Sequence, residues 1–205
     1  GYYTFAKTGF NVLNRNMGAE WKPKGLVVLA GGTGSGKTTF WTSSSRNMAY
    51  GYYDTHGELI KTGSLFFSFE MSKSDLLLKM VGAELHIDTQ SLASGNFQQI
   101  LDDQDTEVWK TEEDIIRAIE DKTAELQQLP IFIIDDARIS LGQMVYQIRK
   151  HVHKYGVRVV AIDYLQIMNH APTGNKNSDL GEIAQVLKDI AKRENITIVL
   201  LSQIN

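Results

Sequence analysis

The stretch Gly31-Gly32-Thr33-Gly34-Ser35-Gly36-Lys37-Thr38 carries the clearest chemistry in the sequence. It fits the spacing G-x-x-x-x-G-K-[ST] of a P-loop, whose backbone N–H groups surround the phosphates of a nucleotide. Glycines let the backbone turn tightly, and the positive end of a following helix attracts the same anion. Lys37 is predicted to reach the β- and γ-phosphates, and the Thr38 hydroxyl to bind Mg²⁺. The alternative is a glycine-rich turn between a strand and a helix.

A glutamate follows the apolar run 65–69. From the strand that we expect beside the P-loop strand, Glu70 is predicted to orient an attacking water or accept its proton. The alternative for Glu70 is a solvated side chain that precedes a helix.

Two acids compete for the position that holds the metal ion, because both follow apolar strand-like runs. They are Asp136, after residues 131–134, and Asp163, after residues 157–162. We favour Asp163, since the next predicted strand ends at Gln203, whose amide is suited to sensing the γ-phosphate beside a metal-binding strand. The alternative for both candidates, and for Asp135, is a strand-end aspartate that caps the next turn.

The elements that must position these residues alternate along the chain. Short, nearly continuous apolar runs alternate with segments of helical periodicity, at residues 26–30, 65–69, 131–134, 157–162 and 196–201. This pattern predicts an α/β fold, with a mostly parallel central sheet and helices on both faces. Ligands bind such sheets at the carboxyl ends of the strands, where each predicted strand places a polar residue.

The predicted helices have recognisable starts. Ser72, Thr111 and Ser140 are expected N-caps, with Asp75 completing a capping box after Ser72. Gly156 is the expected C-terminal glycine of the third of these helices. Candidate core positions of the helix after Thr111 are Ile115, Ile116, Ile119 and Leu126.

The intervening segments are less patterned. We expect residues 1–24 to be an aromatic lead-in packed on the sheet edge, and residues 51–63 and 170–178 to be loops. Only short helical pieces are expected in residues 86–110. A single domain over residues 1–205 is the simplest organisation.

Composition limits the classes of function. The chain has 205 residues, 42% hydrophobic residues, a net charge of −3 and no cysteine. It therefore has no disulfides or thiolate metal sites, which fits a reducing compartment. No apolar run is long enough to span a bilayer, so no membrane partner is expected. A net negative charge gives no overall basic footprint, so nucleic acid would have to bind locally or to an assembly.

Histidines and exposed aromatics suggest no further site. His151 and His153 are two residues apart on a predicted helix, so they do not share a face and are expected to be solvated. Trp41 and three tyrosines, Tyr50, Tyr52 and Tyr53, are expected to pack against the sheet or a neighbouring subunit rather than to stack on bases.

Six segments together resemble, in chain order, motifs of the DnaB-type replicative helicases. They are Thr8-Gly9-Phe10, Gly31 to Thr39, Phe66 to Met71, Ile134-Asp135-Asp136, Ile162-Asp163-Tyr164-Leu165-Gln166-Ile167-Met168 and Leu201-Ser202-Gln203-Ile204-Asn205. The resemblance implies a RecA-like motor domain of a homo-hexameric ring that hydrolyses ATP, or another nucleoside triphosphate, with Mg²⁺. It also implies movement on single-stranded DNA, a primase and a helicase loader as partners, and the cytoplasm of a bacterium or phage-infected cell.

The resemblance also implies roles for single residues. Gly31 to Thr39 would form the phosphate-binding loop, with Lys37 and Thr38 on phosphate and Mg²⁺. Glu70 would activate water, Asp163 would be the Walker B acid, and Gln203 would sense the γ-phosphate.

The sequence also departs from the family pattern. Lys79 stands about where the family has an arginine, and lysine lacks the bidentate contact. Residues 170–178 occupy the position of a pore loop, in which Lys176 is the only lysine or arginine, so a plain solvated loop is an equal alternative. We expect the arginine finger and the main DNA-contacting loop of the family beyond Asn205.

Two other functions share the predicted core. One is a RecA-like recombinase or clock-type ATPase, which differs in its assembly. The other is a nucleotide-binding switch subunit without motor activity, for which Lys37 would matter and Glu70 would not.

Overall fold

The computed structural model describes residues 6–16, 20–103, 108–163 and 176–203. These residues divide into two compact units: unit 1 comprises residues 1–71 and 130–205, and unit 2 comprises residues 72–129. None of the helices in the described ranges has the length and apolar character that crossing a membrane requires.

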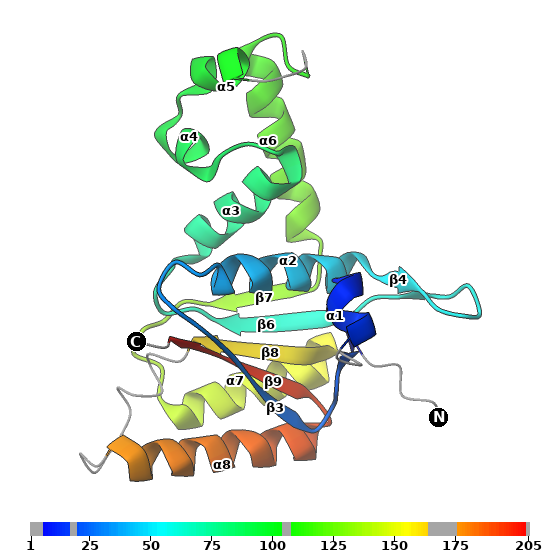
Figure 1. Ribbon diagram of the computed structural model, residues 1–205, viewed down its shortest axis with the longest axis vertical. Helices are drawn as coiled ribbons and strands as arrows, with labels where there is room; N and C mark the ends of the chain where they lie inside the picture. The colour runs from blue at the N-terminus through cyan, green and yellow to red at the C-terminus, as the bar shows by residue number, and fades with distance from the viewer. Residues whose placement is uncertain (1–5, 17–19, 104–107, 164–175, 204–205) are drawn as a thin grey trace. The chain divides into compact units, whose positions relative to one another are not determined.

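Unit 1 is built on a sheet of five parallel strands in the order β3-β9-β8-β6-β7, which lie side by side in Figure 1. The strands are β3 (Gly25–Gly31), β6 (Gly63–Phe67), β7 (Ile131–Ile134), β8 (Val157–Asp163) and β9 (Thr197–Gln203). The predicted parallel sheet is confirmed.

Helices cover both faces of this sheet, as predicted. They are α2 (Lys37–Tyr50), α7 (Leu141–Tyr155) and α8 (Lys176–Glu194). Side chains alternate along a strand. Phe66 therefore meets Trp41 of α2, with ring centroids 6.0 Å apart, whereas Leu65 and Phe67 face the core that α7 and α8 close with Ile148 and Leu187.

The helix ends follow the predicted capping chemistry. Ser140 and Gln143 form a capping box at the start of α7, and Gly156 ends it with a φ of 70°. The prediction for the start of α8 was wrong in part, because this helix begins at Lys176, inside the segment expected as a loop up to Ser178.

The lead-in packs on α2, which corrects the expected position on the sheet edge. It contains β1 (Ala6–Lys7), α1 (Asn11–Asn16) and β2 (Glu20–Trp21). Phe10 stacks on Phe40, and Trp21 lies edge-on to Trp41. The apolar face of a helix offers these aromatic residues more area to bury than one strand edge does.

The connection at residues 51–63 is not a simple loop. It contains a small hairpin of β4 (Tyr52–Tyr53) and β5 (Leu59–Ile60), which projects from the rest of unit 1 in Figure 1. Trp41 is buried, as expected, whereas Tyr53 is 73% exposed and does not pack against the sheet, so for Tyr53 only packing on a neighbouring subunit stays a prediction.

Unit 2 is a small helical unit with its own core. Its helices are α3 (Lys73–Leu85), α4 (Thr89–Ser94), α5 (Phe97–Asp103) and α6 (Glu112–Gln127). The capping box at Ser72, the N-cap Thr111 and the short helices α4 and α5 match the predictions, and Asp114 completes a capping box at Thr111 that was not predicted. Ile115 is fully buried, whereas Ile116 is 40% exposed and does not belong to the core.

Candidate functional site

The loop between β3 and α2 has the backbone geometry of an anion site. Gly34 and Gly36 have φ angles of 71° and 86°, which favour glycine, and no side chain caps the start of α2. The N–H groups of the first turn of a helix lack partners within the helix, and the helix dipole places positive charge there. The loop itself is exposed. It can therefore hold a phosphate group with backbone donors.

Lys37 lies against this loop. Its Nζ donates to the carbonyl oxygens of Gly31 and Gly32, both at 2.7 Å, and to Ser35 Oγ at 3.5 Å. An ammonium group has three donors, so these contacts use all of them. A phosphate bound here would take over some of these donors.

Gly31 is constrained by closeness rather than by an unusual φ. A Cβ at this position would lie 2.5 Å from Ser35 Oγ and 3.6 Å from Lys37 Cγ. Any side chain there would push the loop away from the end of β3. The loop therefore has no room for a Cβ at position 31.

Gln203 meets the loop from the neighbouring strand. β9 pairs with β3 so that Gln203 lies opposite Gly31, and Gln203 Nε2 donates to Thr33 Oγ1. The structure thus brings the predicted sensor residue to the mouth of the predicted phosphate loop. The contact between Gln203 and Thr33 was not foreseen, because sequence does not show which strand lies beside β3.

Asp163 ends β8, the central strand, which pairs with β9. The predicted arrangement, in which the strand ending at Asp163 lies next to the strand ending at Gln203, is confirmed. Asp163 is half-buried at the carboxyl end of the sheet, and Thr38 is half-buried in the first turn of α2. A carboxylate and a hydroxyl are hard oxygen ligands that suit Mg²⁺.

Glu70 follows β6, but β6 is not beside the P-loop strand, so this part of the prediction was wrong. In the order β3-β9-β8-β6, two strands lie between them. At about 4.8 Å per strand, the strand that precedes Glu70 lies about 14 Å sideways from β3. The chain order gave the misleading impression, because the crossover through α2 passes over the positions of two strands that come later in the sequence. Glu70 is exposed at the same carboxyl end as the loop.

Asp136 behaves as the turn cap that we considered as its alternative. It follows the edge strand β7, furthest from β3. Its Oδ1 accepts from the backbone N–H of Arg138 at 3.0 Å, and its carbonyl accepts from that of Ile139 at 3.2 Å. This use of the carboxylate favours Asp163 as the metal residue.

Some predicted residues lie outside the described ranges. They are the run 164–168, most of the loop 170–178, and Ile204 and Asn205.

One histidine prediction was wrong. His151 is buried rather than solvated, between Phe132 and Tyr155, and its Nδ1 donates to the carbonyl oxygen of Gln147 at 2.7 Å. Burial lowers the pKa of His151 below its ordinary value, because the charged ring loses solvation. His153 is exposed, as predicted, and its Nε2 lies 2.9 Å from Glu194.

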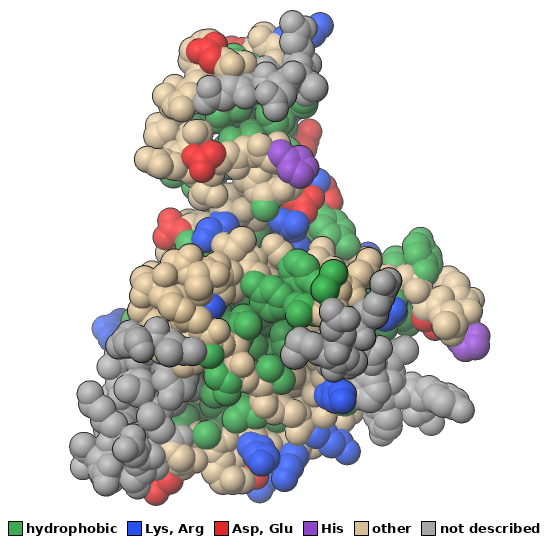
Figure 2. All heavy atoms as spheres, in the orientation of Figure 1, with side chains coloured by type: hydrophobic (Ala, Val, Ile, Leu, Met, Phe, Trp, Pro, Cys, Tyr) green, Lys and Arg blue, Asp and Glu red, His purple; other side chains and the backbone are tan. Residues whose placement is uncertain are grey.

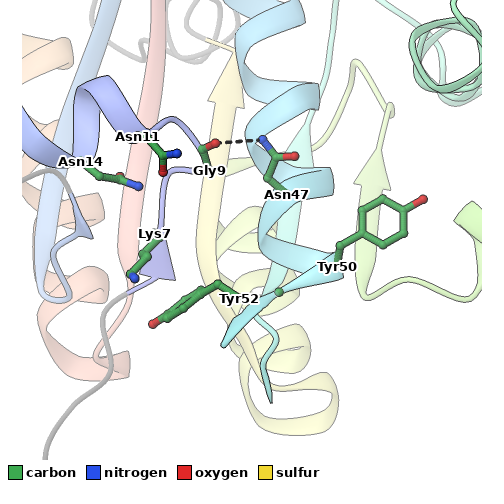
Figure 3. A pocket seen from close by; sticks show the side chains of 8 residues that line it. Lys7, Gly9, Asn11, Asn14, Asn47, Tyr50 and Tyr52 are labelled. Carbon is green, nitrogen blue, oxygen red and sulfur yellow. Dashed lines mark hydrogen bonds between the residues drawn. The ribbon is translucent and has the colours of Figure 1, made fainter. Parts of the chain in front are cut away.

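Sequence reasoning also missed a pocket of about 300 Å³ at the far end of α2 (Figure 3). Lys7 Nζ lies 4.1 Å from the centre of the Tyr52 ring on one side, and Asn47 donates to the carbonyl oxygen of Gly9 at 3.3 Å on the other. Apart from Gly9, which belongs to the segment Thr8-Gly9-Phe10, no motif marks these residues, since they meet only when the lead-in packs on α2.

Comparison with known proteins agrees with this geometry. Residues 6–205 match the family described as "DnaB-like helicase C terminal domain". The chain is 33% identical over 185 residues to the replicative DNA helicase DnaB of a Synechocystis species, covering 88% of this chain and 18% of the relative. It is 28% identical over 205 residues to the corresponding helicase of Buchnera aphidicola, covering 98% of this chain and 39% of the relative. The chain thus spans well under half of these relatives.

Two solved structures share the fold. One, described as an ATPase domain, superposes with a TM-score of 0.76 and 23% identity, covering 98% of this chain and 64% of that one. A DnaB-like replicative helicase, studied with its primase interactions, gives a TM-score of 0.75 and 22% identity, covering 100% of this chain and 44% of that one. At this level of identity the likeness shows a common RecA-like fold.

Proposed function

Because the chain belongs to the DnaB-like helicase C-terminal domain family, we propose that it is the ATP-hydrolysing motor core of a replicative DNA helicase. The observation that carries the proposal is the β3–loop–α2 geometry, with Lys37 folded on the loop and Gln203 reaching Thr33 from the next strand. A family match over residues 6–205 supports treating both units as one ATPase domain. Its place of action is proposed to be the cytoplasm.

The residues at the loop fit a nucleotide with Mg²⁺. Backbone donors of residues 31–39 would hold the phosphates, the Lys37 ammonium would exchange its loop carbonyls for phosphate oxygens, and Thr38 and Asp163 would hold the metal ion. Bound Mg²⁺ supplies charge neutralisation at the phosphates.

The remaining polar residues at the carboxyl ends of the strands, here called the nucleotide rim, have separate roles. Glu70 would orient a water molecule and accept its proton, and Gln203 would register the γ-phosphate through a contact that competes with Thr33. Exchange of the Gln203–Thr33 hydrogen bond for a phosphate contact would link the state of the nucleotide to β9 and to the chain that follows it.

Assembly completes the site in this proposal. A positive group from a neighbouring subunit that stabilises the transition state adds several orders of magnitude to phosphoryl-transfer rates. We therefore propose a homo-hexamer that acts on single-stranded DNA, with primase and a helicase loader as partners. The isolated 205-residue chain should bind ATP and Mg²⁺ but hydrolyse ATP slowly.

The test is ATP-driven unwinding of forked DNA by the protein with four single substitutions. Lys37→Ala should abolish nucleotide binding, and Glu70→Gln should abolish hydrolysis while keeping binding. Asp163→Asn should remove the Mg²⁺ dependence of nucleotide binding. The control Asp136→Asn should change neither nucleotide binding nor ATP hydrolysis. Function in the cell that survives Glu70→Gln but not Lys37→Ala would instead indicate a nucleotide-binding switch. A hexamer that hydrolyses ATP yet never unwinds DNA would refute the helicase proposal.

A further inference from the structure

The amino ends of three adjacent strands carry a group of exposed cations, on the edge of the sheet opposite the phosphate loop. Register places Gly25 of β3 and Val159 of β8 on either side of Thr197 of β9. The cations that lie within a few residues of this line, here called the basic edge, are Lys22, Lys24, Lys154, Arg158, Lys192 and Arg193. All six are exposed, in a chain whose net charge is −3.

Backbone contacts hold these segments together. Thr197 Oγ1 donates to the carbonyl oxygen of Lys22 at 2.7 Å, and the N–H of Lys24 donates to that of Ile196 at 2.8 Å. The turn before β3 is therefore fixed beside the residues that join α8 to β9. Figure 2 shows Lys and Arg side chains gathered where α8 ends and β3 and β9 begin.

Among the side chains that the structure describes, no carboxylate pairs with a cation of the basic edge. The acid within these segments, Glu194, is occupied elsewhere: its Oε1 lies 3.1 Å from Arg149 Nε, and its Oε2 lies 2.9 Å from His153 Nε2. In the part of the chain that the structure describes, no ion pair involves any of the six cations.

Helix capping does not explain the whole group. Cations in the last turn of a helix interact favourably with its dipole, which accounts for Lys154, Lys192 and Arg193. Lys22 and Lys24 lie in a turn, and Arg158 lies in a strand, so this reason does not apply to them.

We infer that the basic edge binds the phosphate backbone of single-stranded DNA, at a site separate from the nucleotide rim. Three strands span about 10 Å, so the cations are spread over a distance that covers more than one backbone phosphate. Tyr155, which is 41% exposed, lies within this group with its ring centre 5.1 Å from Lys154 Nζ. An aromatic ring among repeated positive charges suits a nucleic acid better than an acidic protein, because bases can stack on the ring while the cations contact phosphates. The inference rests on the proposed function only in taking DNA as the ligand.

The test compares three double variants of the protein that each neutralise one Lys and one Arg. Two are in the basic edge, Lys192→Gln with Arg193→Gln and Lys22→Gln with Arg158→Gln. The second pair lies outside any helix end, so it is free of dipole effects. The control, Lys110→Gln with Arg117→Gln, changes two exposed cations of unit 2.

Binding of a fluorescein-labelled oligothymidylate is measured by anisotropy without nucleotide, over a series of salt concentrations. Log K falls as log salt rises, and each lost contact with a phosphate makes this slope shallower by about 0.7. Each basic-edge pair should therefore make it shallower by about 1.4. Over a fourfold rise in salt, the wild type should then lose about sevenfold more affinity than either variant. The control should keep the wild-type slope.

Several results would overturn the inference. An unchanged slope in both basic-edge variants would do so, and so would equal changes in all three variants, which would show a bulk charge effect. A change in the α8 pair alone would also refute the three-strand site. Polyglutamate that competes as well as an oligonucleotide of equal charge would assign the edge to an acidic protein instead. Failure of the wild type to hydrolyse ATP would refute the proposed function. It would leave the comparison of DNA binding between the variants valid, because the binding assay contains no nucleotide.

Discussion

Ser44 fastens the lead-in to α2, and removing its hydroxyl should destabilise unit 1 far more than removing the hydroxyl of Ser45 next to it. Both serines are fully buried in α2. Ser44 Oγ donates to the carbonyl oxygen of Thr8 at 2.7 Å and accepts from Trp21 Nε1 at 3.3 Å. Ser45 Oγ donates only to the carbonyl oxygen of Thr42 at 2.9 Å, within the same helix.

The magnitudes follow from what each substitution leaves behind. Ser44→Ala leaves a buried carbonyl and a buried indole N–H without their partner, at about 1–3 kcal/mol for each group that stays unsatisfied. Because the indole bond at 3.3 Å is longer than usual and so the weaker of the two, we expect a loss of about 2–4 kcal/mol in the free energy of unfolding. After Ser45→Ala, the carbonyl of Thr42 still accepts the regular bond of the helix, so the loss should be about 0.5–1.5 kcal/mol.

Urea denaturation followed by tryptophan fluorescence and far-UV circular dichroism measures both values. For a protein of this size the Ser44→Ala loss corresponds to a fall of about 4–16 °C in Tm. Trp21→Phe removes one of the two groups that Ser44 satisfies, so Ser44→Ala should be less damaging in that background. Equal losses from Ser44→Ala and Ser45→Ala, or strict additivity with Trp21→Phe, would refute the reasoning.

Three further predictions concern the loop, a histidine and a turn. Gly31→Ala should weaken binding of a fluorescent ADP analogue about tenfold or more by pushing Ser35 out of the loop. Ser35→Ala in the same chain should restore part of the affinity. If the affinity does not recover, the damage does not come from contact with Ser35. Because the pKa of His151 is lowered in the folded chain, the unfolded chain binds the proton first, so the free energy of unfolding should fall as pH drops below about 6.5. His151→Phe should make this fall shallower when unfolding by urea is measured at several pH values. An equally steep fall would contradict the role of His151. Gly51→Ala should lower the Tm more than Gly57→Ala, because both have a positive φ but only at Gly51 does a Cβ meet a backbone oxygen, that of residue 60, at 2.5 Å; equal shifts would exclude the clash.

Much of the fold could be predicted because local chemistry and tertiary packing agree. Ser72, Thr111 and Ser140 cap helices as predicted, since a capping box needs only residues within one turn. The P-loop could likewise be located, because its geometry depends on a short run of glycines between a strand and a helix.

The errors arose where the outcome depends on distant parts of the chain. Helical spacing made Ile116 a core candidate, but the angle at which α6 meets its neighbours leaves it exposed and buries Ile115. His151 looked like a solvated residue, yet its helix turns it towards Phe132 of β7. Periodicity shows how wide the apolar face of a helix is, but it does not show which residue lies at the centre of that face and is buried most deeply.

By itself the sequence determined the identity of the phosphate loop, the strand-helix alternation and the residues that end each strand, because these depend on neighbours along the chain. Only the tertiary structure decided that Gln203 lies beside the loop, that two strands separate β6, which precedes Glu70, from β3, and that Asp136 follows the edge strand. The physical reason is that strand order is set by how crossover helices pack on the two faces of the sheet. That packing is a property of the whole core, which no single segment encodes.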